Sequence, residues 1–166
     1  MFIAGIIAAL SLSTPAVKAV PTSPEICSLL QAAYSGFDRD GREIHPSNVK
    51  AATNEISDIK KFVVKYKEAM ELTNSEFADL AMMQGLTPHG PFVPSCQWKG
   101  RVGSEALGVQ GVGWVAFSQP IISSDGQIAL VEVSSGGNFS AYGLLCIMRV
   151  KSNAWSSRCL NSWSVR

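Results

Sequence analysis

The chain has 166 residues, 46% of them hydrophobic, and carries 14 Lys and Arg against 13 Asp and Glu. This length predicts one domain with enough apolar material for a core, and the composition excludes global disorder. The near-zero net charge, without a polybasic run or a concentrated basic face, argues against a nucleic-acid-binding protein and against electrostatic binding to a membrane surface.

Residues 1–19 have the pattern of a secretory signal peptide. Phe2–Leu12 is an apolar run too short to span a bilayer, and Ser13-Thr14-Pro15 interrupts it. Small residues just before the expected site predict cleavage after Ala19. No positive charge precedes the apolar run, so a buried N-terminal helix is the alternative. The sequence therefore predicts a mature domain, residues 20–166, that is periplasmic or secreted and not a membrane protein after cleavage.

Residues 22–86 are expected to form the helical part of the domain. Thr22 is a candidate N-cap for a first helix, because Glu25 follows three residues later, and Gly36 is expected to end it. Spaced acidic residues after this helix suggest calcium as an alternative to a solvated turn. When Gly41 is aligned with the invariant glycine of an EF-hand loop, both anchoring carboxylates are absent, which favours the turn.

A long second helix is expected after Ser47 and Asn48, which can cap it. Its apolar residues recur at steps of three and four, as on one face of a helix. We expect this stripe to pack on a sheet, with a coiled-coil partner as the alternative. The capping box Thr73-Asn74-Ser75-Glu76 predicts a third, short helix that ends at Gly85. The stripe consists of Val49, Ala52, Ile56, Ile59, Val63, Tyr66 and Met70.

Residues 92–166 are expected to form an antiparallel sheet of four or more strands. Gly113–Ser118 and Gln127–Ser134 are β-rich, and the Asp125-Gly126 turn between them is a strong hairpin signal. Pro120 cannot donate to a strand ladder and is placed at a bulge or an edge. No strand is assigned to the glycine-containing segment 99–112.

The last two strands are expected at Tyr142–Val150 and Trp155–Trp163, joined by a tight turn at Ser152-Asn153. This turn fixes the pairing register, and Cys146 then faces Cys159 on a non-hydrogen-bonded pair, where a disulfide fits. The other predicted pairs are Val150 with Trp155, Met148 with Ser157, Leu144 with Asn161 and Tyr142 with Trp163.

The four cysteines predict two disulfides if the protein is exported. The hairpin register selects Cys146–Cys159 and leaves Cys27–Cys96. A zinc site is the alternative, but such sites usually bring their cysteines in close pairs, and this spacing does not. We therefore expect no metal and no cofactor.

No catalytic residue is predicted. The histidines, His45 and His89, both lie beside prolines in predicted loops, and no nucleophile–base motif is present. Strand alternation leaves Glu132 either on a solvent face, which we favour, or in a concave pocket. The candidate pocket residues are Glu132, Tyr142, Trp155 and Trp163, the three aromatic residues sharing the disulfide face of the last hairpin, where core packing is the better expectation.

The last third of the chain contains a set of motifs: the FSxPxxSxD run Phe117–Asp125, Ala129-Leu130-Val131, Leu144-Leu145, Lys151, Trp155 and Trp163. With these motifs it resembles an uncharacterised kind of bacterial secreted domain, and this resemblance implies no activity. Helices followed by a hairpin-linked sheet are also similar to NTF2-like and cystatin-like folds, in which a helix closes a curved sheet around a pocket.

The sequence thus predicts an exported α+β domain with three N-terminal helices packed on a C-terminal antiparallel sheet. The expected function is a small binding protein whose partner is another protein, for example an inhibitor or an immunity-type protein. The alternative is an NTF2-like pocket enzyme that uses Glu132 or a histidine as general base. The pattern predicts no oligomeric state.

Overall fold

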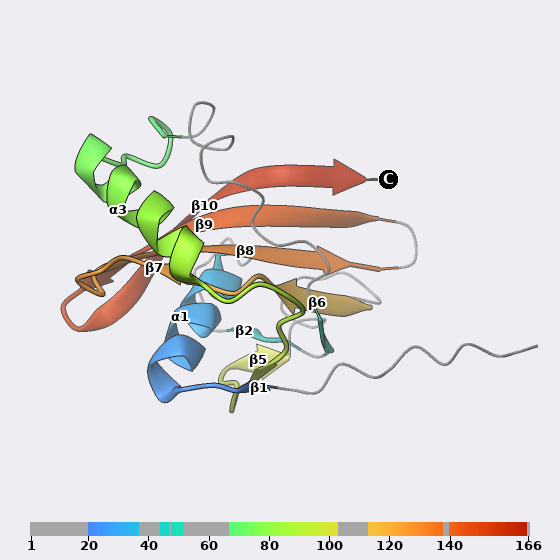
Figure 1. Ribbon diagram of the computed structural model, residues 1–166. Helices are drawn as coiled ribbons and strands as arrows, with labels where there is room; N and C mark the ends of the chain where they lie inside the picture. Colours follow the sequence, from blue (N-terminus) through green and yellow to red (C-terminus); the bar gives the residue numbers. More distant parts are fainter. Residues whose placement is uncertain are drawn as a thin grey trace, which may run out of the picture.

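The computed structural model describes residues 20–36, 44–46, 48–51, 67–102, 113–137 and 140–165. These residues form an α+β domain with two helices packed on a mixed, mostly antiparallel six-stranded sheet (Figure 1). The strands of this sheet are β3 (Val49–Ala51), β6 (Trp114–Phe117), β7 (Ile121–Ile122), β8 (Ile128–Gly136), β9 (Ala141–Lys151) and β10 (Ala154–Val165). Their order is β10-β9-β8-β6-β3, and β7 also pairs with β8.

Two short parallel pairs lie outside this sheet. β1 (Val20–Pro21) pairs with β4 (Pro94–Ser95), and β2 (Ile44–His45) pairs with β5 (Arg101–Val102). Sequence patterns did not predict these strands, because each has only two residues and shows no periodicity. Their effect is to hold the connector after the helical part close to the start of the domain.

Helix α1 (Pro24–Ser35) ends at Gly36, as predicted, but its N-cap is Ser23 rather than Thr22. The Ser23 hydroxyl accepts a hydrogen bond from the backbone N–H of Ile26 at 3.3 Å. Thr22 instead uses its hydroxyl to accept from the backbone N–H of Ser95 at 3.1 Å. One residue therefore starts the helix, and its neighbour attaches this end of the chain to β4.

Helix α3 (Asn74–Leu86) begins with the predicted capping box: Thr73 accepts from the Glu76 N–H, and the Glu76 carboxylate accepts from the Thr73 N–H. The prediction that Gly85 ends the helix is wrong, since Gly85 lies inside it and Thr87 is the C-cap. Leu80 is the one fully buried residue of α3, so this helix lies on the surface of the core.

The predicted second helix is wrong at both ends, and its middle, residues 52–66, lies outside the described residues. Val49–Ala51 is a strand parallel to β6, and residues 67–71 form turns. The Val115 N–H donates to the Asn48 carbonyl at 2.8 Å, and the Asn48 side chain donates to the Gly113 carbonyl. Pairing with β6 thus overrides the helical periodicity of this segment and makes the sheet mixed rather than wholly antiparallel.

The two faces of the sheet carry separate hydrophobic clusters because successive strand residues point to opposite sides. Ala129, Val131 and Val133 of β8 belong to the cluster under α1, and Ile128 and Leu130 belong to the cluster under α3. The helices therefore cover opposite faces (Figure 1). The α1 cluster also includes Leu29, Leu30, Ala33, Tyr34, Phe92, Val115, Phe117, Leu144, Cys146 and Met148; the α3 cluster also includes Met70, Leu72, Leu80, Ile121, Leu145 and Ile147.

The polar residues of the FSxPxxSxD run satisfy the backbone of β8. The Ser118 hydroxyl accepts from the Glu132 N–H at 2.8 Å, and the Ser123 hydroxyl accepts from the Ile128 N–H at 2.9 Å. Asp125 in turn accepts from the Ser123 hydroxyl at 2.6 Å. Pro120 lies between β6 and β7, where the strand is interrupted, which agrees with its expected place. The motif is therefore accounted for by turn and strand structure.

The last hairpin follows the predicted register over most of its length. Ser152 and Asn153 form the turn, with φ angles of 50° and 62°, as in the tight turns that hairpins prefer. All predicted pairs up to Leu144–Asn161 are confirmed. The prediction that Tyr142 faces Trp163 is wrong: the register shifts between Asn161 and Trp163.

A groove between helix α1 and the last hairpin

A groove of about 970 Å³ lies between α1, the segment that follows β4, and the start of β10. Helix α1 provides one wall, the connector after β4 provides the second, and the first residues of β10 provide the third. The lining residues are Thr22, Pro24, Cys27, Ser28, Gln31, Ala32, Ser35, Gly36, Ser95, Gln97, Lys99, Ala154, Trp155, Ser156 and Ser157.

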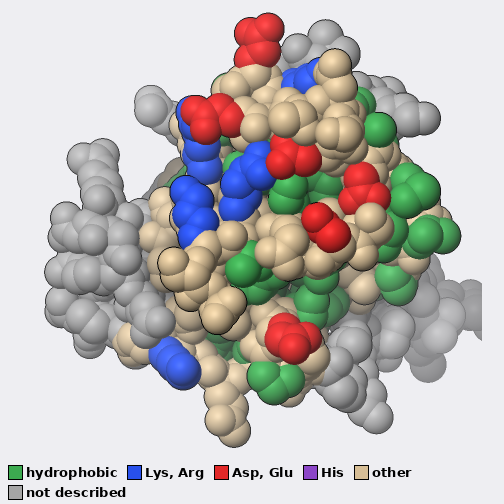
Figure 2. Space-filling model, turned by 90° about the vertical axis from the view of Figure 1, so that its left-hand side faces the viewer, with side chains coloured by type: hydrophobic (Ala, Val, Ile, Leu, Met, Phe, Trp, Pro, Cys, Tyr) green, Lys and Arg blue, Asp and Glu red, His purple; other side chains and the backbone are tan. Residues whose placement is uncertain are grey.

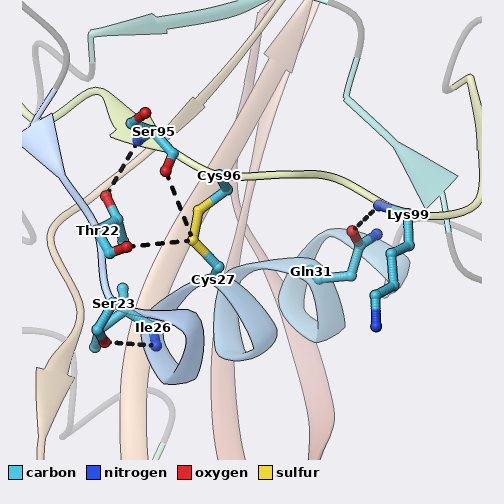
Figure 3. The surroundings of a disulfide bond; sticks show 8 residues. All are labelled: Thr22, Ser23, Ile26, Cys27, Gln31, Ser95, Cys96 and Lys99. Atoms are coloured by element: carbon cyan, nitrogen blue, oxygen red, sulfur yellow. Dashed lines mark hydrogen bonds between the residues drawn. A yellow bond between two sulfur atoms is a disulfide. The ribbon is translucent and has the colours of Figure 1, made fainter.

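The Cys27–Cys96 disulfide joins the first two walls (Figure 3). Its Cα atoms are 5.5 Å apart, and the Cys27 sulfur lies 3.9 Å from the Ser95 carbonyl oxygen. One helical turn further along, the Gln31 side-chain oxygen accepts from the Lys99 backbone N–H at 2.9 Å. Gln31 is buried. The helix and the connector are thus attached at two points along the groove.

The second disulfide, Cys146–Cys159, supports the end of α1 from the sheet. Its Cα atoms are 4.0 Å apart, and both sulfur atoms lie 3.9 Å from the Ala33 carbonyl oxygen. A Cβ atom on Gly36 would lie 2.6 Å from the Cys159 sulfur, closer than any side chain tolerates. Glycine at this position therefore lets the end of the helix rest on the disulfide.

The groove offers hydrogen-bonding groups and little charge. Hydroxyl and amide side chains dominate its lining, and Trp155 adds a half-buried aromatic ring. Among the described lining residues, Lys99 is the one charged group, and there is no carboxylate and no histidine. These residues can bind a polar ligand through hydrogen bonds and one aromatic contact, but they include no acid–base pair for general acid–base catalysis.

The four candidate pocket residues do not meet in one site. Trp155 lines the groove, while Tyr142 lies close enough to Tyr34 to affect its ionisation. Burial, and to a smaller extent the proximity of Tyr142, raises the pKa of Tyr34 to about 12. Glu132 and Trp163 meet each other on the α3 face of the sheet.

The favoured prediction that Glu132 faces solvent is wrong, since it is only 5% exposed. Its Oε1 atom accepts from the Trp163 indole nitrogen at 2.6 Å and from the Ser162 hydroxyl at 3.1 Å. Burial raises the pKa of Glu132, and the hydrogen bonds from Trp163 and Ser162 oppose this shift. Both partners come from β10, two strands away, so the carboxyl group ties the edge of the sheet to its centre.

A bulge in β10 brings Trp163 to this carboxyl group. Trp163 pairs with Gly143, so the extra residue turns its side chain from the disulfide face to the Glu132 face. A Cβ atom on Gly143 would overlap the Trp163 indole and would lie 2.7 Å from the Ser162 hydroxyl oxygen. A glycine inside a strand often marks a bulge or a place where another group approaches the backbone closely. Gly143 is therefore the residue from which this contact could have been predicted.

Charged side chains attach α3 to the sheet on the face shown in Figure 2, where acidic and basic groups lie side by side. Arg149 of β9 donates from Nη1 to Glu76 Oε1 at 2.6 Å and from Nη2 to the Glu71 carbonyl at 3.0 Å. The hydrogen bond from Arg149 is the main cause that lowers the pKa of Glu76 to about 2. Arg158 of β10 pairs with Glu71 close by, on a more exposed part of the surface. No sequence motif predicts this cluster, because its members are far apart in the chain.

No family model, curated protein or solved structure matches this chain. The resemblance to a bacterial secreted domain therefore stays a prediction. Among the described residues, no group of three or more His, Cys, Asp or Glu side chains could hold a metal ion. In the same part of the chain, no helix is long and apolar enough to cross a membrane.

Proposed function

We propose that this protein is an exported binding protein that holds part of another protein in the groove between α1 and the start of β10. The observation that carries the proposal is the bracing of the groove: one disulfide joins two of its walls and the other supports the end of α1. A groove fixed before binding loses little conformational entropy when its ligand arrives, which favours affinity.

Export is supported by the cysteines. All four are in disulfides, and such bonds persist in oxidising, extracytoplasmic compartments. The periplasm and the outside of the cell both meet this condition. A partner protein in the same compartment would reach the groove without crossing a membrane.

The side chains that line the groove indicate which kind of ligand it favours. Hydroxyl and amide groups from Ser28, Ser95 and Gln97 suit polar side chains and peptide groups, and Lys99 favours a neutral or acidic segment over a basic one. Trp155 supplies a ring of the type that contributes strongly to protein interfaces.

The alternative, an enzyme with Glu132 as general base, receives less support. Two donors already engage the Glu132 carboxyl group, and neither Glu132 nor Trp163 lines the groove. Loss of a measured turnover in Glu132→Gln would nevertheless favour this alternative.

Affinity capture from the extracytoplasmic fraction of the native host tests the proposal. Ala32→Arg places a long side chain in the groove on a helix that accepts arginine well, and we expect it to abolish capture of the partner. Met82→Arg, at an exposed position of α3 on the other face, is the matched control and should capture as the wild type does. Equal capture by all three proteins would contradict the groove as the binding site.

A further inference from the structure

We infer that the ligand of the groove is an extended segment of the partner protein that adds a strand to the free edge of β10. This inference rests on the proposed binding function and deepens it by naming the surface and the form of the partner. β10 is the last strand in the order β10-β9-β8-β6-β3, and no strand of the described residues pairs with its outer side. Ala154–Ser157, the first part of this edge, also lines the groove.

The outward-pointing backbone groups of β10 follow from the hairpin register. The Val150 N–H donates to the Gln127 carbonyl at 3.0 Å, on the β8 side, so Val150 and its neighbour Trp155 do not form a hydrogen-bonded pair. Trp155 must therefore point its own N–H and C=O away from β9. The alternation of an antiparallel ladder gives Ser157 and Cys159 the same orientation, whereas Ser156 and Arg158 bond to β9.

Within the described residues, this edge lacks the features that usually block strand addition. Natural edge strands are commonly protected by prolines, lysines, inward-pointing charges, bulges or short length. β10 is 12 residues long and contains no proline and no lysine, and its bulge lies beyond Asn161. Arg158, its one described charged residue, pairs with Glu71. Among the described residues, the eight residues Ala154–Asn161 therefore form a regular edge with no strand paired to its outer side.

The groove beside the edge identifies the occupant as a polypeptide with polar side chains. A strand added to β10 would turn every second side chain towards the groove, whose described lining residues include hydroxyl groups and Lys99 but no carboxylate. Charge complementarity thus favours small polar or acidic residues at those positions. Main-chain hydrogen bonds supply affinity in this mode, and the groove supplies selectivity.

The first experiment identifies a defined probe and follows the backbone directly. Peptides long enough to pair with Ala154–Asn161 are selected from a random display library on the protein with both disulfides intact, and the most enriched peptide is the probe. Amide hydrogen exchange is then measured by NMR with and without it. We expect the amides of Ser157 and Cys159 to slow by about tenfold or more on binding, and that of Arg158, already bonded to β9, to change little.

The second experiment compares two variants of one residue. Ser157→Pro removes an outward N–H without removing a bond to β9, so the hairpin should keep its register. Ser157→Ala removes only the hydroxyl group. We expect Ser157→Pro to weaken binding of the probe by roughly tenfold or more, and Ser157→Ala to weaken it less. Far-ultraviolet circular dichroism checks that both variants fold, and the exchange data stand whether or not the proline variant does.

The outcomes separate this inference from the proposed function. Loss of binding in both Ala32→Arg and Ser157→Pro supports both. Loss in Ala32→Arg alone, without slowed exchange at Ser157 and Cys159, overturns strand addition and keeps the groove. Loss in neither variant overturns both, and so does a selection in which no peptide is enriched. A dimer in sedimentation equilibrium that Ser157→Pro dissociates would show that a second copy occupies the edge, which overturns the assignment to a partner protein.

Discussion

The two faces of the central sheet attach their helices by different means. On one face, α1 is fixed by the Cys27–Cys96 disulfide beside it and by Cys146–Cys159 beneath its end. On the other, α3 is held by Leu80 in a small apolar cluster and by the ion pair between Glu76 and Arg149. The covalent attachment lies on the face with the groove, and the ionic attachment lies on the face without it.

This difference gives the face with the groove the attachment that depends less on solution conditions. A disulfide keeps two segments together at any pH or ionic strength, whereas an ion pair weakens in salt and disappears when its carboxylate is protonated. Reduction should therefore act mainly on the groove, and acid mainly on the α3 face.

The largest effect is expected from removing the Cys27–Cys96 disulfide. Replacing both residues by serine releases a loop with a sequence separation of 69, and chain-entropy models give a loss of about 4 kcal/mol in the free energy of unfolding. Guanidinium unfolding followed by circular dichroism measures this loss. The same substitutions at Cys146 and Cys159, separated by 13 residues, should cost less, about 3 kcal/mol. The reverse order would show that support from the sheet matters more than the joining of the groove walls.

An intermediate effect is expected from Arg149→Met, which removes the ion pair and leaves the capping box of α3 intact. Because the hydrogen bonds lost are charge-assisted, we expect the free energy of unfolding to fall by roughly 1 to 2 kcal/mol at neutral pH. The pKa of Glu76 lies at about 2 in the folded protein against an ordinary value of 4.5, so this stabilisation is present above 4.5 and is lost as the pH falls towards 2.

Urea unfolding of Arg149→Met and wild type across this pH range checks the prediction. The difference between them should shrink in acid and in high salt. Arg158→Met is the control, because its pair with Glu71 is exposed and should matter less. A difference that did not depend on pH would mean that Arg149 stabilises the fold by packing rather than by charge.

The smallest effect is expected from Glu132→Gln and is a change in pH dependence. Burial raises the pKa of Glu132, so its contribution to stability is greatest below the ordinary value of 4.5 and is lost as the pH rises through the higher, folded value. The glutamine side chain of the variant does not titrate, so it makes no such pH-dependent contribution. The melting temperature of the variant should therefore rise relative to that of the wild type as the pH increases above 4.5. Parallel curves for the two proteins would show that the carboxyl group keeps one protonation state throughout.

Sequence patterns predicted the parts of this fold that depend on neighbouring residues. Three of these parts are local: the Thr73 capping box, the Gly36 helix end and the Ser152-Asn153 turn. Counting residues outward from this turn then predicts that Cys146 pairs with Cys159. The parallel strand β3 was missed because its pairing with β6 joins distant segments, and a helical period in its apolar residues pointed elsewhere.

The candidate site was harder to predict than the fold. The groove is lined mainly by common serine and glutamine side chains that carry no motif, and of its lining residues only Trp155 was predicted as a candidate pocket residue. Glu132 was noticed as unusual, but its burial depends on the bulge in β10, which reverses the face of Trp163. The alternation of side chains along a strand cannot predict a single extra residue, because a bulge interrupts the two-residue period of that alternation.

The connectivity of the disulfides also matters for biosynthesis. The bonds join consecutive cysteines, Cys27 to Cys96 and Cys146 to Cys159, and a chain emerges from the ribosome amino end first. Cys27 and Cys96 are thus both available before the second pair has been made. Of the three ways to pair four cysteines, an oxidant that links them in order of emergence forms this one directly. A chain oxidised in that order needs no isomerase to rearrange incorrect pairs.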